Sequence, residues 1–95
     1  IEEARVGDSI RFRIKNPPND KSAWVGIYAL HAQDKDHGEE GVGWMWLRDL
    51  RSNRASFPER SEGRWSIRVF QDGGYTMVCR LEFDVLPKKE RWWED

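Results

Sequence analysis

Short stretches in which every second residue is apolar recur along this chain, and they constrain its fold more than any other feature. In the clearest stretch, residues 9–15, isoleucine and phenylalanine alternate with arginine and lysine. Successive side chains of a strand point to opposite faces, so this alternation is typical of a strand with one face on a core and one in water. Similar alternation at 65–69 and 81–85 flanks Asp-Gly-Gly at 72–74, which predicts a hairpin whose tight turn uses glycines at positive φ.

The remaining strands are predicted from apolar runs bounded by loop segments rich in proline, glycine, asparagine and aspartate. These runs cover residues 23–30, 44–49 and 55–57, and residues 1–5 are a further candidate for a short edge strand. No window has a convincing helical pattern. Short strands joined by such loops are typical of an all-β fold, so we predict an immunoglobulin-like antiparallel β-sandwich of about seven strands.

The composition supports one domain with an aromatic core. A chain of 95 residues has the length of a single domain, and its six tryptophans, four phenylalanines and two tyrosines supply large apolar side chains for one core. We assign residues 1–87 to the sandwich and residues 88–95 to a charged C-terminal tail that contains Trp92 and Trp93. Three interpretations of the tail stay open: it covers an edge strand, begins a following segment, or docks a partner.

Charge and cysteine content exclude several classes of function. The formal net charge of −1 lacks the basic field that nucleic-acid binding requires, so no nucleic-acid partner is expected. No apolar run approaches the ~20 residues of a membrane span, and the near-neutral charge argues against a membrane partner. Cys79 is the only cysteine and cannot form an intramolecular disulfide. We therefore expect an intracellular protein, cytoplasmic or associated with the cytoskeleton.

The residue types that carry enzymatic chemistry do not occur in productive patterns. Cys79 lies within a predicted strand, where a buried free thiol behaves as a small apolar side chain, and no histidine is spaced to activate it. The loop at 31–43 contains histidines and carboxylates, but their spacing fits neither a calcium loop nor a zinc site. We therefore predict that the protein is not an enzyme and uses no metal or cofactor.

The predicted strand that begins at Trp44 is apolar on both faces. Trp44 and Trp46 share one face, while Met45 and Leu47 share the other. A half-exposed strand needs only one apolar face, so one pair either covers another element or forms an exposed interaction patch. The pattern does not decide which pair is outside. Trp24, by contrast, is predicted to fill the space between the two sheets.

Arginines recur on two predicted strands and in one connection. Arg11 and Arg13 are expected to point outward from one strand, and Arg68 and Arg80 from another. Arg48 lies in a connection. Two interpretations stay open: a solvated face balanced by nearby acidic residues, or a patch that holds an acidic peptide or a phosphate by bidentate hydrogen bonds.

Three segments together resemble a known family. Ala-Trp-Val-Gly-Ile-Tyr at 23–28 resembles the Trp-hydrophobic-Gly-Ile-aromatic strand of the SKICH domain, an immunoglobulin-like module of autophagy adaptors and some inositol-polyphosphate phosphatases. Trp-Met-Trp-Leu at 44–47 resembles the family's tryptophan-containing middle strand, and residues 63–75 resemble the start of its closing hairpin. The resemblance spans about residues 6–86. It implies a non-catalytic module that docks proteins or localises its parent.

These observations predict a protein–protein interaction module within a larger intracellular, scaffold- or adaptor-like protein. It would bind a protein partner, such as a peptide or acidic segment, through an apolar and aromatic strand surface and an arginine-rich face. Two alternatives stay open: an accessory domain that packs on and positions a phosphoesterase-type catalytic domain, or a module that binds anionic lipids. The oligomeric state is not predicted. The candidate partner-binding residues are Trp44, Met45, Trp46, Arg48, Arg11, Arg13, Arg68, Arg80, Trp92 and Trp93.

Overall fold

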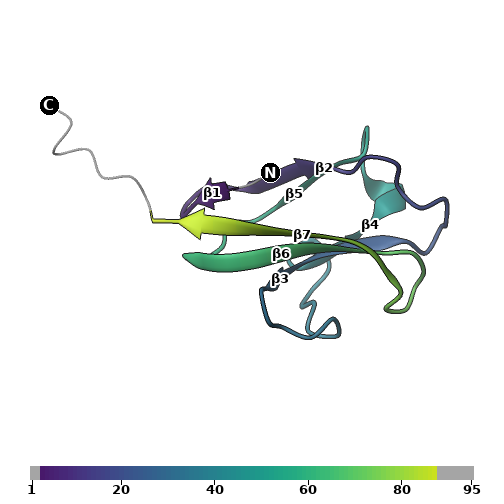
Figure 1. Cartoon of the computed structure of the whole chain (residues 1–95). Helices are drawn as coiled ribbons and strands as arrows, with labels where there is room; N and C mark the ends of the chain where they lie inside the picture. The colour runs from purple at the N-terminus through teal and green to yellow at the C-terminus, as the bar shows by residue number, and fades with distance from the viewer. Residues whose placement is uncertain (1–2, 88–95) are drawn as a thin grey trace, which may run out of the picture.

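Seven strands in two facing sheets form the structure, a computed structural model that describes residues 3–87 (Figure 1). The larger sheet has five strands in the order β1-β7-β6-β3-β4, and the smaller sheet pairs β2 with β5. The predicted all-β sandwich of about seven strands is therefore confirmed. The strands are β1 (Glu3–Arg5), β2 (Ile10–Arg13), β3 (Trp24–Ala29), β4 (Trp44–Trp46), β5 (Arg54–Phe57), β6 (Gly63–Phe70) and β7 (Met77–Leu86).

The strand order matches the central part of an immunoglobulin-type sandwich. Strands β7, β6 and β3 lie opposite β2 and β5 (Figure 1), as strands G, F and C face B and E in that fold. One pairing differs from the predicted antiparallel arrangement, because β1 runs parallel to β7 with Glu3 opposite Asp84. The other pairings between the strands of the described chain are antiparallel.

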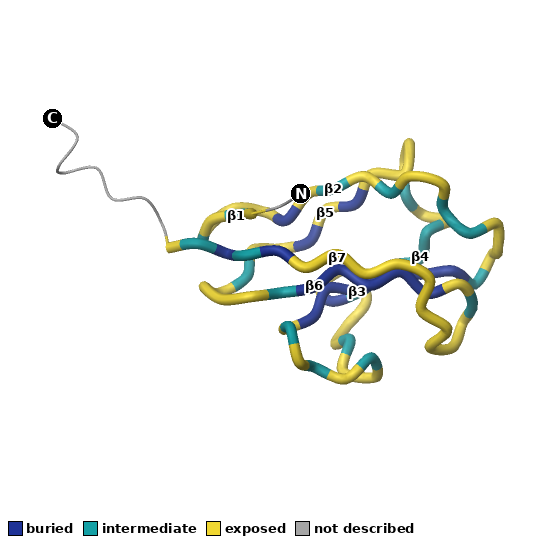
Figure 2. Tube along the Cα trace, in the orientation of Figure 1, coloured by how far each residue is buried: buried dark blue, intermediate teal, exposed yellow. Residues whose placement is uncertain are grey.

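Alternation along the strands places the main core between the sheets. Val25 and Ile27 of β3 point from the larger sheet toward β2 and β5, together with alternate residues of β6 and β7. From the smaller sheet they meet Ile10 and Phe57, which have no exposed surface. Figure 2 shows these buried segments in both sheets. We call this cluster the inter-sheet core.

The opposite face of the larger sheet is covered as well. Trp24, Tyr28 and Phe70 form a second buried cluster there, with the Trp24 and Phe70 rings stacked at 4.2 Å between centroids. We call this cluster the outer aromatic cluster and this side of the larger sheet its outer face. The loop at 30–43 lies on this side, away from β2 and β5 (Figures 1 and 2). Strand β3 is therefore buried on both faces, which explains its unbroken apolar sequence. The prediction that Trp24 lies between the two sheets is wrong, because this loop covers it instead.

The connection from β6 to β7 differs from the predicted tight turn. Residues 71–76 form a longer loop, in which neither Gly73 nor Gly74 has a positive φ. The Asp72 carboxylate instead accepts hydrogen bonds from the Gly74 N–H at 2.9 Å and from the Thr76 hydroxyl at 3.1 Å. Because the aspartate side chain holds the loop, left-handed glycines are not needed.

A single turn is the only helical segment within residues 3–87. The strand predicted at 44–49 ends at Trp46, and Leu47–Asp49 form a 3₁₀ turn closed by a hydrogen bond from the Leu50 N–H to the Leu47 carbonyl. The described residues thus contain no helix with the length and apolar character that crossing a membrane requires.

Candidate binding site

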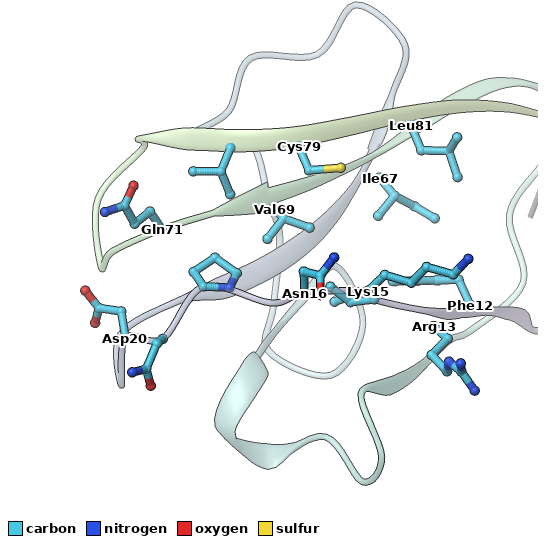
Figure 3. Close-up of a pocket in the computed structure, with 14 residues that line it drawn as sticks. Phe12, Arg13, Lys15, Asn16, Asp20, Ile67, Val69, Gln71, Cys79 and Leu81 are labelled. Carbon is cyan, nitrogen blue, oxygen red and sulfur yellow. The ribbon is translucent and has the colours of Figure 1, made fainter.

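A groove of about 730 Å³ opens between the two sheets beside the first half of β7 (Figure 3). Ile67 and Val69 of β6 line it together with Cys79 and Leu81 of β7, which lie opposite them in the strand register. Phe12 of β2 lines it from the smaller sheet. These side chains belong to the inward faces of their strands, so the groove is an opening in the inter-sheet core.

The free edge of β7 accounts for the opening. Strand β1 pairs only with the last three residues of β7, and no other described strand pairs with that edge. Three large apolar side chains of the uncovered half are exposed: Met77 by 40%, Val78 by 48% and Leu81 by 39%. Strand β2 also has a free edge, since its only partner in the described chain is β5. Two unpaired backbone edges therefore border one apolar groove.

The rim of this inter-sheet groove is polar. Arg13 and Lys15 lie beside β2, and Asp20 and Gln71 lie toward one end (Figure 3).

The Cys79 thiol lies in the groove and is exposed. The prediction of a buried thiol is wrong because no strand covers this half of β7.

The structure decides which face of β4 carries which pair of side chains. Trp46 lies opposite Trp24 in the register of β3, and both Trp44 and Trp46 pack against the outer aromatic cluster. Both tryptophans are half-buried, so part of their surface remains open to solvent. Met45 points the other way and packs against the inter-sheet core. It therefore does not share a surface with the two tryptophans.

A small pocket of about 190 Å³ lies beside these tryptophans on the outer face. Its lining is almost entirely aromatic. The lining residues are Trp24, His37, Trp44, Trp46, Gly73 and Tyr75. The pocket brings together strands β3 and β4, the loop at 30–43 and the loop at 71–76.

Arg68 is buried, contrary to the prediction that it points outward. Its side chain is 2% exposed and forms an ion pair with Asp34 at 2.8 Å. It also donates hydrogen bonds to the carbonyl oxygens of Leu30 and Ala32, and its guanidinium lies 4.3 Å from the ring centroid of Tyr28. Alternation does direct Arg68 away from the inter-sheet core, but the loop at 30–43 covers that face. The loop therefore supplies hydrogen-bond acceptors and an opposite charge for the buried guanidinium.

The other arginines do not gather into one face. Arg11 and Arg13 of β2 are exposed and line one hollow together with Arg54 of β5, and Arg13 also borders the inter-sheet groove. Arg80 reaches the loop at 30–43 on the far side of the larger sheet, where it donates to a backbone carbonyl at 2.8 Å. Arg48 stacks over Trp46 at 4.8 Å from the ring centroid. The predicted arginine-rich face is therefore divided, because the β2 arginines lie on the smaller sheet, whereas Arg48 and Arg80 lie against the larger sheet.

The Tyr28 hydroxyl should make the stability of the fold depend on pH in the alkaline range. Its hydroxyl donates to the backbone carbonyl of Asp34 at 2.7 Å. Burial, and next the Asp34 carboxylate, raise the pKa of Tyr28 above its ordinary value of 10.0. The stability gained from the neutral hydroxyl is fully present below pH ~10 and is lost as the pH rises further. We expect the free energy of unfolding to fall above pH ~10 by up to about 1.4 kcal/mol per pH unit.

Two tyrosine variants isolate this effect, which urea denaturation at several alkaline pH values measures. Tyr28→Phe should remove the Tyr28 part of the alkaline fall, at a cost of about 0.5–1.5 kcal/mol at neutral pH for the lost hydrogen bond. Tyr75→Phe changes an exposed tyrosine and should keep the wild-type slope. Equal slopes in wild type and Tyr28→Phe would contradict the expectation.

Comparisons with protein families, with curated proteins and with solved structures found no match to this chain. Within residues 3–87, no group of three or more histidine, cysteine or carboxylate side chains is placed to hold a metal ion. The predicted tail at 88–95, with Trp92 and Trp93, lies outside the described residues.

Sequence reasoning missed both hollows as sites. Leu81 was recognised only as a strand residue, because local alternation does not show which part of a strand edge lacks a pairing partner. Tyr75 and His37 come from separate loops, and no spacing rule joins them to the β4 tryptophans. The one sequence feature that pointed to the aromatic pocket was the apolar character of both faces of β4.

Proposed function

We propose that this domain is a non-catalytic protein-binding module whose inter-sheet groove accepts an extended apolar segment of a partner. The observation that carries the proposal is the coincidence of an open apolar groove with the free edge of β7. A partner strand added to that edge would gain backbone hydrogen bonds, and its alternate side chains would fill the groove. The SKICH-like pattern and the predicted intracellular setting support the same class of function.

The groove favours a particular kind of segment. Its floor of aliphatic side chains and Phe12 requires apolar residues at alternate positions of the partner. Arg13 and Lys15 on the rim favour acidic residues at the intervening or flanking positions, where charge-assisted hydrogen bonds can form. The expected ligand is therefore an extended apolar peptide with acidic flanks, in agreement with the acidic segment predicted from the sequence.

Selection from a phage-displayed library of random linear peptides tests this function. Selected peptides should alternate apolar residues, and Leu81→Arg should weaken their affinity by about tenfold or more, because it places a charge in the groove. Val42→Arg is the matched control, since Val42 is another exposed aliphatic residue but does not line the groove. Isothermal titration calorimetry gives the affinities.

Cys79 provides an independent readout in the same experiment. As the only cysteine in the chain and an exposed one, it reports access to the groove through its rate of maleimide labelling. A bound peptide should slow that labelling. Peptides that bind without protecting Cys79, or that lose equal affinity in Leu81→Arg and Val42→Arg, would place the site elsewhere and overturn the proposal.

A further inference from the structure

The aromatic pocket on the outer face is built from rings at right angles to one another. Trp24 forms a floor that is only 4% exposed. The rings of His37, Trp44 and Tyr75 stand at 75°, 76° and 77° to it, with centroids 5.4–5.9 Å away. His37 and Tyr75 are nearly parallel to each other, at 28° and 6.5 Å. The pocket is therefore an open hollow that aromatic rings border on several sides.

The loop that contributes His37 is fixed against the sheet. The carbonyl oxygen of Gly43 accepts the N–H of Ile27 at 2.9 Å, and Gly43 donates to the Glu39 carbonyl at 2.8 Å. A Cβ atom at Gly43 would collide with the carbonyl oxygen of His37, so only glycine allows the loop to approach this closely. The indole N–H of Trp24 donates to the Gly74 carbonyl at 3.0 Å and holds the loop of Tyr75 in place. The ring arrangement is thus preorganised.

The chemistry of this pocket favours a cation. The face of an aromatic ring attracts a positive charge within ~6 Å of its centroid, most strongly for tryptophan. The molecule already uses this attraction at the rim, where the Arg48 guanidinium lies over Trp46. Carboxylates flank the lining residues in the chain, since Asp36 precedes His37 and Asp72 precedes Gly73.

The size of the pocket selects among cations. A cavity of about 150 Å³ is large enough to bind benzene, so a pocket of about 190 Å³ accepts a compact apolar cation. A plain ammonium ion is strongly hydrated and loses that hydration on entry, whereas a methylated ammonium is weakly hydrated and presents apolar surface to every ring. A choline lipid would also bring a phosphate close to Asp36 and Asp72, which disfavours it.

We propose that this pocket binds the methylated ammonium group of a modified lysine side chain in a partner protein. The site lies on the face of the larger sheet opposite the inter-sheet groove, and its occupancy does not depend on a ligand in that groove. The exposed surfaces of the rings would contact the methyl groups, and the flanking carboxylates would attract the charge.

Free choline and its neutral isostere 3,3-dimethyl-1-butanol provide the first test. The two have the same shape and differ in charge, so we expect choline to shift the Trp24 and Trp44 indole N–H signals in NMR spectra while the isostere binds at least about fivefold more weakly. Sodium chloride is added to the isostere samples so that their ionic strength equals that of the choline samples. Equal binding of both compounds, or no saturable binding of choline, would overturn the proposal.

Peptides distinguish the source of the cation. A peptide with trimethyllysine should bind more tightly than the same peptide with unmodified lysine, and phosphatidylcholine vesicles should not co-sediment the protein. Tyr75→Ala should weaken trimethyllysine binding by about fivefold or more, whereas Tyr75→Phe should retain it. Val42→Ala changes an exposed apolar residue that lines neither the inter-sheet groove nor this pocket, and it should leave trimethyllysine binding unchanged. Binding to the vesicles but not to the peptide would overturn the assignment to a protein side chain.

Discussion

Replacing Arg68 with methionine should lower the free energy of unfolding by about 3–5 kcal/mol. The change removes the ion pair with Asp34 at 2.8 Å and the hydrogen bonds to the carbonyls of Leu30 and Ala32. It leaves those acceptors facing an apolar side chain that cannot donate. Because these contacts hold the loop at 30–43 on the sheet, the loop and the aromatic pocket beneath it should loosen together. Urea denaturation followed by tryptophan fluorescence measures the loss.

Arg64 offers a matched control on the same strand. It also pairs with a carboxylate, Asp84, at 2.9 Å, but both side chains are about half exposed. Arg64→Met should cost no more than about 1 kcal/mol, because water screens a surface ion pair and replaces it easily. Because the two ion pairs have nearly the same distance, the difference between the two variants measures the effect of burial on stability. If Arg68→Met and Arg64→Met lost similar stability, the account of Arg68 as the anchor of the loop would be wrong.

Truncation of Phe57 to alanine should have an effect of similar size, about 3–5 kcal/mol. Phe57 has no exposed surface, and with Ile10 it is one of two fully buried side chains that the smaller sheet adds to the inter-sheet core. The two sheets share no strand ladder in the described chain, so side-chain packing joins them. A domain of this size has a free energy of unfolding of roughly 5–15 kcal/mol, so much of the population should unfold on warming.

Phe12→Ala is the control for this second variant. Phe12 stacks on Phe57 at 5.9 Å between centroids but is only half-buried, because it borders the inter-sheet groove. Phe12→Ala should therefore lower the free energy of unfolding clearly less than Phe57→Ala does. Thermal unfolding monitored by circular dichroism ranks the two. A larger loss for Phe12 would mean that the groove is closed in solution.

The strands could be predicted from the sequence because each one has a local signal. Alternation located β2, β6 and β7, and the turn-forming residues separated them. The parallel pairing of β1 could not be predicted, since it joins residues near opposite ends of the chain. The turn at 71–76 was mispredicted because the glycines at 73 and 74 indicated a tight turn, while the Asp72 side chain stabilises a longer loop.

The candidate site was less predictable than the fold. Trp44 and Trp46 could be singled out from the sequence, because their strand is apolar on both faces and a half-exposed strand needs only one apolar face. Arg68 was predicted to be exposed because alternation shows only which face of the sheet a side chain lies on. Whether that face is exposed to solvent depends on a loop that is distant in sequence. The inter-sheet groove depends on the absence of a facing strand, which no local pattern encodes.

The pairing of β1 with β7 has a consequence for how this chain folds. Glu3 and Asp84 can meet only after almost the whole described chain has been laid down, so closing that loop costs conformational entropy before any contact is gained. The antiparallel pair β6–β7 is local and can form first. Strand β1 has no partner until β7 is in place, so we expect it to complete the sheet last. By the same reasoning we expect it to detach first when the fold begins to open.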